Sequence, residues 1–275
     1  MYTIVLALIF CVSSCKQDAN LSSQKVNNGR ISLGRNAVVP IIGVDSKGIV
    51  HCTGTLIKEH GVLFLLTAAH CVHRGTDNYI VARRDPKMSR SQWERHIARN
   101  PKSRTIPINL HADPRYKYND DNVKIGAQND IAIAKLDSSK FSKKEFEAMT
   151  EAALEIDYTS EISSMQGRVR IIGAGRSWSG VGVMREGKLN LSVTKAEGAQ
   201  SIMVKGKYSI FPCTETCQGD SGGPLLYKNP KNKKEYVVGV LHGGDSAQES
   251  VYANLSNGRF KEGMRSLLQD ISCKK

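Results

Sequence analysis

Apolar residues along this chain recur mostly in short β-branched runs, separated by glycine, asparagine, aspartate and proline. Short runs of this kind, with few apolar positions at helical spacing, favour an all-β barrel or sandwich. In the first half of the chain we expect strands at 37–44, 51–57, 61–67, 79–82, 106–110 and 130–136. In the second half we expect strands at 167–177, 189–193, 201–204 and 236–241.

Two segments depart from the strand pattern. Residues 141–156 are rich in Lys, Glu, Ala and Leu, and they predict a polar helix that links two barrels. Residues 259–272 carry apolar positions at helical spacing, which predicts a terminal amphipathic helix packed on the core. With 275 residues, the chain is long enough for one large β domain or two coupled barrels with a sizeable core.

The N-terminal 30 residues differ in kind from the rest. Residues 3–12 form a short apolar run that is typical of a secretory signal peptide. The run ends in Val-Ser-Ser-Cys at 12–15, which resembles a bacterial lipobox with Cys15 as the lipidated residue; the alternative is ordinary cleavage near Ser14. A single acyl chain would anchor the protein to a membrane surface without spanning it. The polar residues 16–30 predict a tether or propeptide.

The charge of the chain is strongly positive, with a formal net charge of +13. Eight basic residues, against only Asp85 and Glu94, lie within residues 83–104. This basic insert is either a solvated loop or a surface that binds an anionic partner. It lacks aromatic interleaving or a nucleic-acid motif, so we expect no specific nucleic-acid binding. We find no Gly-rich loop that would cradle a phosphate, and we expect no cofactor.

The candidate chemistry centres on residues 217–224, Cys-Gln-Gly-Asp-Ser-Gly-Gly-Pro. Glycine beside Ser221 lets the backbone take a positive φ and lets a substrate carbonyl approach closely. The backbone N–H groups of Gly219 and Ser221 could then point at one developing oxyanion. Serine needs a base, and a group that orients the base, to act as a nucleophile. Upstream motifs supply both, Thr-Ala-Ala-His-Cys with His70 and Asn-Asp-Ile-Ala with Asp130.

These three motifs, in the order His, Asp, Ser, resemble those of the trypsin-like (chymotrypsin-family) serine endopeptidases. The resemblance implies an all-β fold of two six-stranded antiparallel barrels with a short C-terminal helix. The peptidase domain would cover 31–275, with one barrel at about 31–140 and the other at about 157–258. In such an enzyme Ser221 attacks the peptide carbonyl, His70 is the general base and Asp130 orients the imidazole.

The resemblance implies protein or peptide substrates. With the N-terminal signals, it favours a bacterial protein that is secreted, periplasmic or on the cell surface, or an outer-membrane lipoprotein before activation. A membrane would be a partner only through the N-terminal lipid. The alternative function is a catalytically inactive binding module on the same scaffold, which would use the basic insert.

The resemblance also implies activation by proteolysis. In this family, cleavage after a basic residue frees an isoleucine amine that pairs with the aspartate before the nucleophile. Here Arg30 and Ile31 would form the cleaved bond and Asp220 would receive the amine, although Ser-Leu at 32–33 replaces the usual Val-Gly. An activating protease would then be a partner, and the cut would release the domain from any lipid. The alternative is that Arg30 belongs to a plain linker.

Cysteine usage indicates an oxidising compartment. By resemblance, Cys52 and Cys71 form the bridge beside the catalytic histidine. Cys217 lacks its usual family partner, so Cys213–Cys217 is the simplest replacement, with Cys273 free or paired elsewhere. The cysteine spacing fits bridges better than zinc. The basic insert has the wrong charge for the calcium loop of some relatives, so we expect no metal.

The sequence specifies the preference for the substrate's P1 residue less strongly than it specifies the catalytic residues. Glu215 stands where relatives that cleave after Arg or Lys have an aspartate, which predicts a basic P1 residue; alternatively, Glu215 turns away into a salt bridge. His242 stands where a serine usually supports the buried aspartate. It would either hydrogen-bond Asp130 or help to bind an acidic P1 group. The substrate would pair with the edge formed by His242, Gly243 and Gly244.

Overall fold

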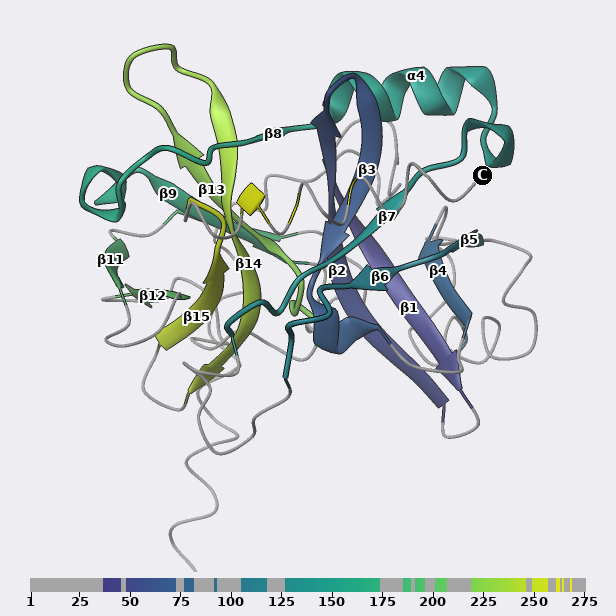
Figure 1. The fold of residues 1–275 in the computed structure, drawn as a ribbon, viewed down its shortest axis with the longest axis horizontal. Coiled ribbons are helices and arrows are strands. Elements are labelled where there is room, and N and C mark those ends of the chain that lie inside the picture. The colour runs from purple at the N-terminus through teal and green to yellow at the C-terminus, as the bar shows by residue number, and fades with distance from the viewer. Residues whose placement is uncertain are drawn as a thin grey trace, which may run out of the picture.

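Two largely antiparallel sheets lie side by side in the computed structural model (Figure 1). The structure describes residues 37–45, 48–72, 77–81, 92, 105–117, 127–173, 185–188, 191–195, 201–206, 219–245, 249–256, 261–262, 264 and 268. The first sheet has the strand order β5-β4-β1-β2-β3-β7-β6, and the second has the order β10-β9-β13-β14-β15-β12-β11, with β8 paired to β14.

The strands of the first sheet are β1 (Val38–Asp45), β2 (Gly48–Glu59), β3 (Val62–Thr67), β4 (Asp77–Val81), β5 (Thr105–Ile108), β6 (His111–Ala112) and β7 (Ala132–Lys135). Those of the second are β8 (Glu155–Ile156), β9 (Val169–Gly173), β10 (Arg185–Lys188), β11 (Leu191–Lys195), β12 (Ser201–Gly206), β13 (Pro224–Lys228), β14 (Glu235–Asp245) and β15 (Glu249–Asn254).

The predicted all-β class with two antiparallel sheets is confirmed. The described residues form seven strands in one sheet and eight in the other, where six per barrel were expected. Part of the difference is β6 and β8, which have two residues each. Strands this short contain no alternation of apolar and polar residues that a sequence could display.

The larger hydrophobic core joins the two sheets. It contains side chains from the first sheet such as Leu56 and Ile133, both fully buried, together with Val237 and Val240 from β14. A second cluster, which includes the fully buried Ile202, lies within the second sheet. Burial of apolar area is the main driving force for such packing, so the sheets are held together by a shared interior.

A helix and a crossing segment connect the sheets (Figure 1). Helix α4 (Lys143–Ala152) begins with a capping box between Ser142 and Glu145. The helix was expected to extend to residue 156, and that end is wrong. Leu154 instead exchanges backbone hydrogen bonds with β2, by donating to Leu56 and accepting from Lys58. Because β2 satisfies the backbone N–H and the carbonyl of Leu154, the chain leaves the helix, becomes extended and continues into β8.

At the C-terminal end, the described residues Lys261, Glu262, Met264 and Leu268 are helical. Met264 is buried and Leu268 packs against the larger core, as the amphipathic pattern predicted. The basic insert at 83–104, apart from Gln92, and residues 1–36 lie outside the described residues. Within the described part of the chain, the helices are all too short or too polar to traverse a bilayer.

Candidate active site

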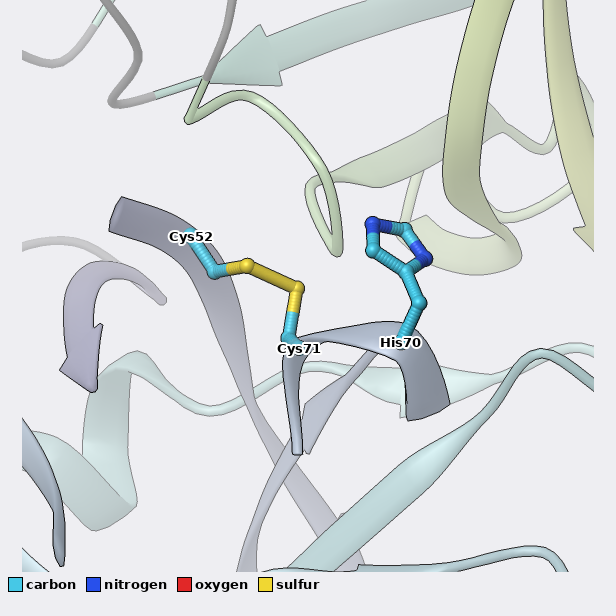
Figure 2. Close-up of side chains that lie close together, drawn as sticks. All are labelled: Cys52, His70 and Cys71. Carbon is cyan, nitrogen blue, oxygen red and sulfur yellow. A yellow bond between two sulfur atoms is a disulfide. The ribbon is translucent and has the colours of Figure 1, made fainter. Parts of the chain in front are cut away.

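His70 lies in a short turn that a disulfide ties to the first sheet. Strand β3 ends at the buried Thr67, and the 3-10 turn η2 (Ala69–Cys71) follows. The predicted bridge between Cys52 on β2 and Cys71 is present. Figure 2 shows the His70 imidazole projecting from the same turn, beside the bridge. The disulfide therefore fixes the backbone from which the imidazole projects.

Asp130 is the buried centre of the site. It follows a turn in which Asn129 has a φ of 55°, and its side chain has no exposed surface. The backbone N–H of His70 donates to Oδ1 at 2.8 Å, and His70 Nδ1 lies 2.6 Å from Oδ2. The structure thus brings together two of the three residues that the motifs suggested.

His242 reaches the same carboxylate from the second sheet. Its Nδ1 lies 2.5 Å from Asp130 Oδ2, at a β-bulge where the β14–β15 register shifts between Leu241 and Gly243. The His70 and His242 rings meet edge to face, with centroids 5.3 Å apart. Of the two roles considered for His242, this geometry favours the hydrogen bond to Asp130.

The charge of Asp130 determines which nitrogen of each imidazole faces it as a donor. Burial raises the pKa of Asp130, but hydrogen bonds from His242 and His70 outweigh burial, so the pKa lies below its usual value. Asp130 is therefore ionised at neutral pH and can only accept hydrogen bonds. Each imidazole must then carry its proton on Nδ1, which leaves the Nε2 of a neutral His70 as a base.

The turn that carries Ser221 is enclosed by both sheets. Gly219 has a φ of 98° and Gly222 a φ of 83°, which favour glycine. A Cβ on Gly222 would lie 2.1 Å from Thr67 Oγ1 and 2.3 Å from the carbonyl oxygen of Thr53. The second sheet holds Gly222 as well, because its N–H donates to the carbonyl of Leu241.

Ser221 itself lies close to the disulfide next to His70. Its carbonyl oxygen is 3.8 Å from Cys71 Sγ and accepts a 2.7 Å hydrogen bond from the N–H of Thr53. The hydroxyl of Thr53 donates to the carbonyl of Gly219 at 2.8 Å. No motif pointed to Thr53, since its only sequence signal is its place after Cys52.

Asp220, between these residues, turns its carboxyl group toward the second sheet. A Cβ on Gly173, at the end of β9, would lie 2.1 Å from Asp220 Oδ1. Burial and the nearby charge of Asp220 raise the pKa of Tyr252, a fully buried residue of β15. Asp220 is partly buried, and Ile31, whose amine was expected to pair with it, lies outside the described residues.

The clustered histidines and carboxylate are arranged for hydrogen bonds. Two ligands on one tetrahedral Zn²⁺, each at about 2 Å from the ion, are roughly 3.3 Å apart. The imidazole nitrogens lie only 2.5 and 2.6 Å from Asp130 Oδ2, so these atoms would have to separate to hold a metal. Cys52 and Cys71, which lie near His70, are consumed by their disulfide.

The remaining predicted site residues divide into two groups. Gly243 and Gly244 lie on β14 opposite Val251 and Ser250 of β15. Within the described residues, β13 pairs with β14 only as far as Val240, so the opposite edge of β14 is not covered by β13 there. Outside the described residues lie Cys15, Arg30, Ile31, Cys213, Glu215, Cys217 and Cys273.

Comparisons with known proteins agree with this geometry. The sequence model of the family described as Trypsin matches residues 35–259. Venom serine protease 34 of Apis mellifera is 26% identical over 225 residues, which cover 76% of this chain and 50% of that protein. The chain thus spans about half the length of this relative.

Two solved structures share the fold at low sequence identity. A thermostable serine protease AL20 from an extremophilic microorganism has a TM-score of 0.57 at 13% identity, and 88% of this chain covers 100% of that one. The protease Anisep from Arthrobacter nicotinovorans has a TM-score of 0.55 at 12% identity, and 86% of this chain covers 97% of that one.

The ionised Asp130 predicts a pH-dependent contribution to stability. Because the folded-state pKa lies below the unfolded value of about 3.9, the carboxylate stabilises the fold above about pH 4, and this stabilisation is lost as pH falls through the folded-state pKa. We expect Asp130→Asn to lower the free energy of unfolding by about 2–4 kcal/mol at pH 7. Urea denaturation at pH 7, 5 and 3 should show the deficit shrinking at the lowest pH.

The control is Glu151→Gln, on an exposed residue of α4, which should match the wild type at each pH. A deficit for Asp130→Asn that is the same at pH 3 and pH 7 would show that the charge of Asp130 does not stabilise the fold.

Proposed function

The chain belongs to the trypsin family, and from this premise we propose that it is a serine endopeptidase that acts through an acyl-enzyme on Ser221. The observation that carries the proposal is the 2.6 Å contact between His70 Nδ1 and the buried Asp130. This contact leaves Nε2 as the basic nitrogen of the imidazole. His70 shares its turn with Cys71, whose Sγ lies 3.8 Å from the Ser221 carbonyl oxygen. A base, its orienting carboxylate and a serine in a glycine-lined turn are the parts that acyl transfer needs.

In the proposed mechanism, Ser221 Oγ attacks a peptide carbonyl while His70 Nε2 takes its proton. Asp130 holds the imidazole in the required tautomer and stabilises the imidazolium that forms. The N–H groups of Gly219 and Ser221 donate to the oxyanion. His70 then protonates the leaving amine, and water hydrolyses the acyl-enzyme by the reverse steps.

His242 stands where relatives have a serine that supports the buried aspartate, and we propose that it donates a hydrogen bond to Asp130 in place of that serine. The 2.5 Å contact commits its Nδ1–H to the carboxylate, which supports a role in orienting Asp130 over one in binding an acidic P1 group. Within the described residues, β13 does not pair with β14 at Gly243 and Gly244, which supports binding of the substrate there as an added antiparallel strand. Glu215 then remains as the candidate carboxylate for a basic P1 side chain.

We further propose that the enzyme is made as a zymogen, cut between Arg30 and Ile31 by another protease. The sequence supports this, because Arg30 precedes an isoleucine and Asp220, which by resemblance would receive the new amine, directly precedes Ser221. The signal-like N-terminus supports secretion from a bacterium, either as a soluble protein or as a lipoprotein held through Cys15. If Cys15 carries a lipid, the same cut would also release the peptidase domain from the membrane.

The rival function is a binding module. It would bind an anionic partner through the basic insert at 83–104, and its triad would be catalytically inactive. The intact pairing of His70 with Asp130 favours the enzyme, since a binding module would need neither an oriented base nor a carboxylate with no exposed surface, which is costly to desolvate.

Labelling with an organophosphonate separates the two functions. We expect the processed protein to incorporate about one phosphonate per chain, since His70 and the turn amides activate only Ser221. Intact-mass measurement should show no adduct on Ser221→Ala and a full adduct on the control Ser164→Ala, which changes a serine of the 3-10 turn η5 (Ile162–Met165). Correctly processed wild-type protein that takes up no label would favour the binding module.

Fluorogenic peptides that differ only at P1 test the specificity. We expect kcat/KM to be about tenfold or more higher for Arg and Lys than for Glu or Leu, because a carboxylate at Glu215 would pair with the basic side chain. Glu215→Gln should lower kcat/KM for the basic peptides alone. A preference for acidic P1 residues would instead implicate His242 and reject the role of Glu215.

N-terminal sequencing of active protein tests the activation step. We expect the mature chain to begin at Ile31, and Arg30→Gln protein to stay uncut with activity reduced by about 10²-fold or more, as for loss of an oxyanion donor. Lys25→Gln, which changes a basic residue of the same segment, serves as the control and should be processed normally. A different mature N-terminus in fully active protein would reject this activation site.

A further inference from the structure

Thr53 is the point at which the first sheet contacts the nucleophile turn, the turn at residues 219–223 that carries Ser221. It is fully buried on β2. Strand β3 pairs with β2 only from Thr55 to Glu59. The edge of β2 that faces β3 is therefore not paired with β3 at Thr53. The Ser221 carbonyl accepts from the Thr53 N–H there, at 2.7 Å.

Thr53 contacts the turn a second time through its side chain. Its hydroxyl donates to the carbonyl of Gly219 at 2.8 Å, while its own carbonyl accepts from the hydroxyl of Thr67, also at 2.8 Å. One residue of the first sheet therefore holds the turn at both Gly219 and Ser221. The two bonds made by the threonine hydroxyls are buried, where an unpaired carbonyl would be costly.

These bonds restrict the residue that has most freedom to move. Gly219 has no side chain, and its φ of 98° lies in a region that other residues rarely adopt. Rotation about its two backbone bonds would turn its N–H away from a bound substrate. The hydrogen bond to its carbonyl fixes the peptide plane that follows Gly219, so that the N–H can turn only by rotation about the N–Cα bond. The next carbonyl, that of Asp220, is held by the N–H of Gly223 at 2.8 Å, which fixes the peptide plane containing the Ser221 N–H.

We propose that Thr53 is a positioning residue for the oxyanion-binding turn, whose hydroxyl holds Gly219 so that its N–H faces the substrate carbonyl. This role rests on the proposed peptidase activity. A side chain of β2, 166 residues away in sequence, would thus help to position a donor for the oxyanion of the transition state. The hydroxyl itself does not touch the substrate, so its effect should appear in the chemical step and not in substrate binding.

The test compares Thr53→Val, which removes the hydroxyl at nearly constant volume, with Thr53→Ser, which keeps it. Loss of a whole oxyanion donor costs about 10²–10³-fold in kcat, so misalignment in Thr53→Val should lower kcat by about 10–100-fold, with KM within about threefold. Thr53→Ser should restore most of the activity. All rates are normalised to the sites titrated with the phosphonate, so that loss of folded protein does not count.

Thr55→Val is the matched control. Thr55 lies two residues along the same strand and is equally buried, but within the described residues its hydroxyl has no hydrogen-bond partner. The same substitution there should leave kcat unchanged. A peptide aldehyde, which forms an oxyanion with the enzyme, should bind more weakly to Thr53→Val, while the matching peptide alcohol, which forms none, should bind equally well.

Each outcome decides the proposal. It is overturned if Thr53→Val has wild-type kcat, if Thr55→Val loses as much, or if Thr53→Ser is no better than Thr53→Val. Should Thr53→Val fail to fold, Thr53→Ala and Thr53→Ser, which differ by the hydroxyl alone, provide the same comparison. A wild-type protein that hydrolyses no peptide rejects the proposed function itself, which is a different result from active protein that is indifferent to Thr53.

Discussion

The structure depends on how one buried negative charge is satisfied. Asp130 has no exposed surface, and a carboxylate in such a place is strongly destabilising unless donors surround it. Two donors come from His70, beside the first sheet, and the third comes from His242 on the second. The carboxylate is therefore fully paired only when the two sheets are docked. Assembly of the fold and assembly of the site are the same event.

The nucleophile turn, like Asp130, receives its hydrogen bonds from both sheets. Its carbonyl groups are bonded by Thr53 from one side, and its Gly222 N–H is bonded to Leu241 from the other. The space around Gly222 is already filled by Thr67 and Thr53. Neither sheet alone would define this turn, because glycine-rich backbone has little conformational preference of its own. The shared hydrophobic core, with members from both sheets, keeps these polar contacts in register.

Sequence reasoning succeeded where a signal is local. The β-branched runs predicted β1 to β3, and two short motifs led to His70 and Asp130. It failed where a partner is distant: Thr53 contacts Gly219 from 166 residues away, which no motif expresses. It left His242 with two roles, because only the bulge in β14 determines where the ring points. The end of α4 was wrong for a similar reason, since Leu154 finds its hydrogen bonds in β2.

The crossing segment from α4 through β8 is the covalent link between two incomplete halves (Figure 1). Four of the ten residues of α4 are exposed, Lys143, Lys144, Glu147 and Glu151, so a protease could cleave the chain there without entering the core. Each fragment would then hold part of the machinery, His70 and Asp130 in one and Ser221 in the other. The proposed peptidase activity would then report the reassociation of the two fragments, as in a split-enzyme assay.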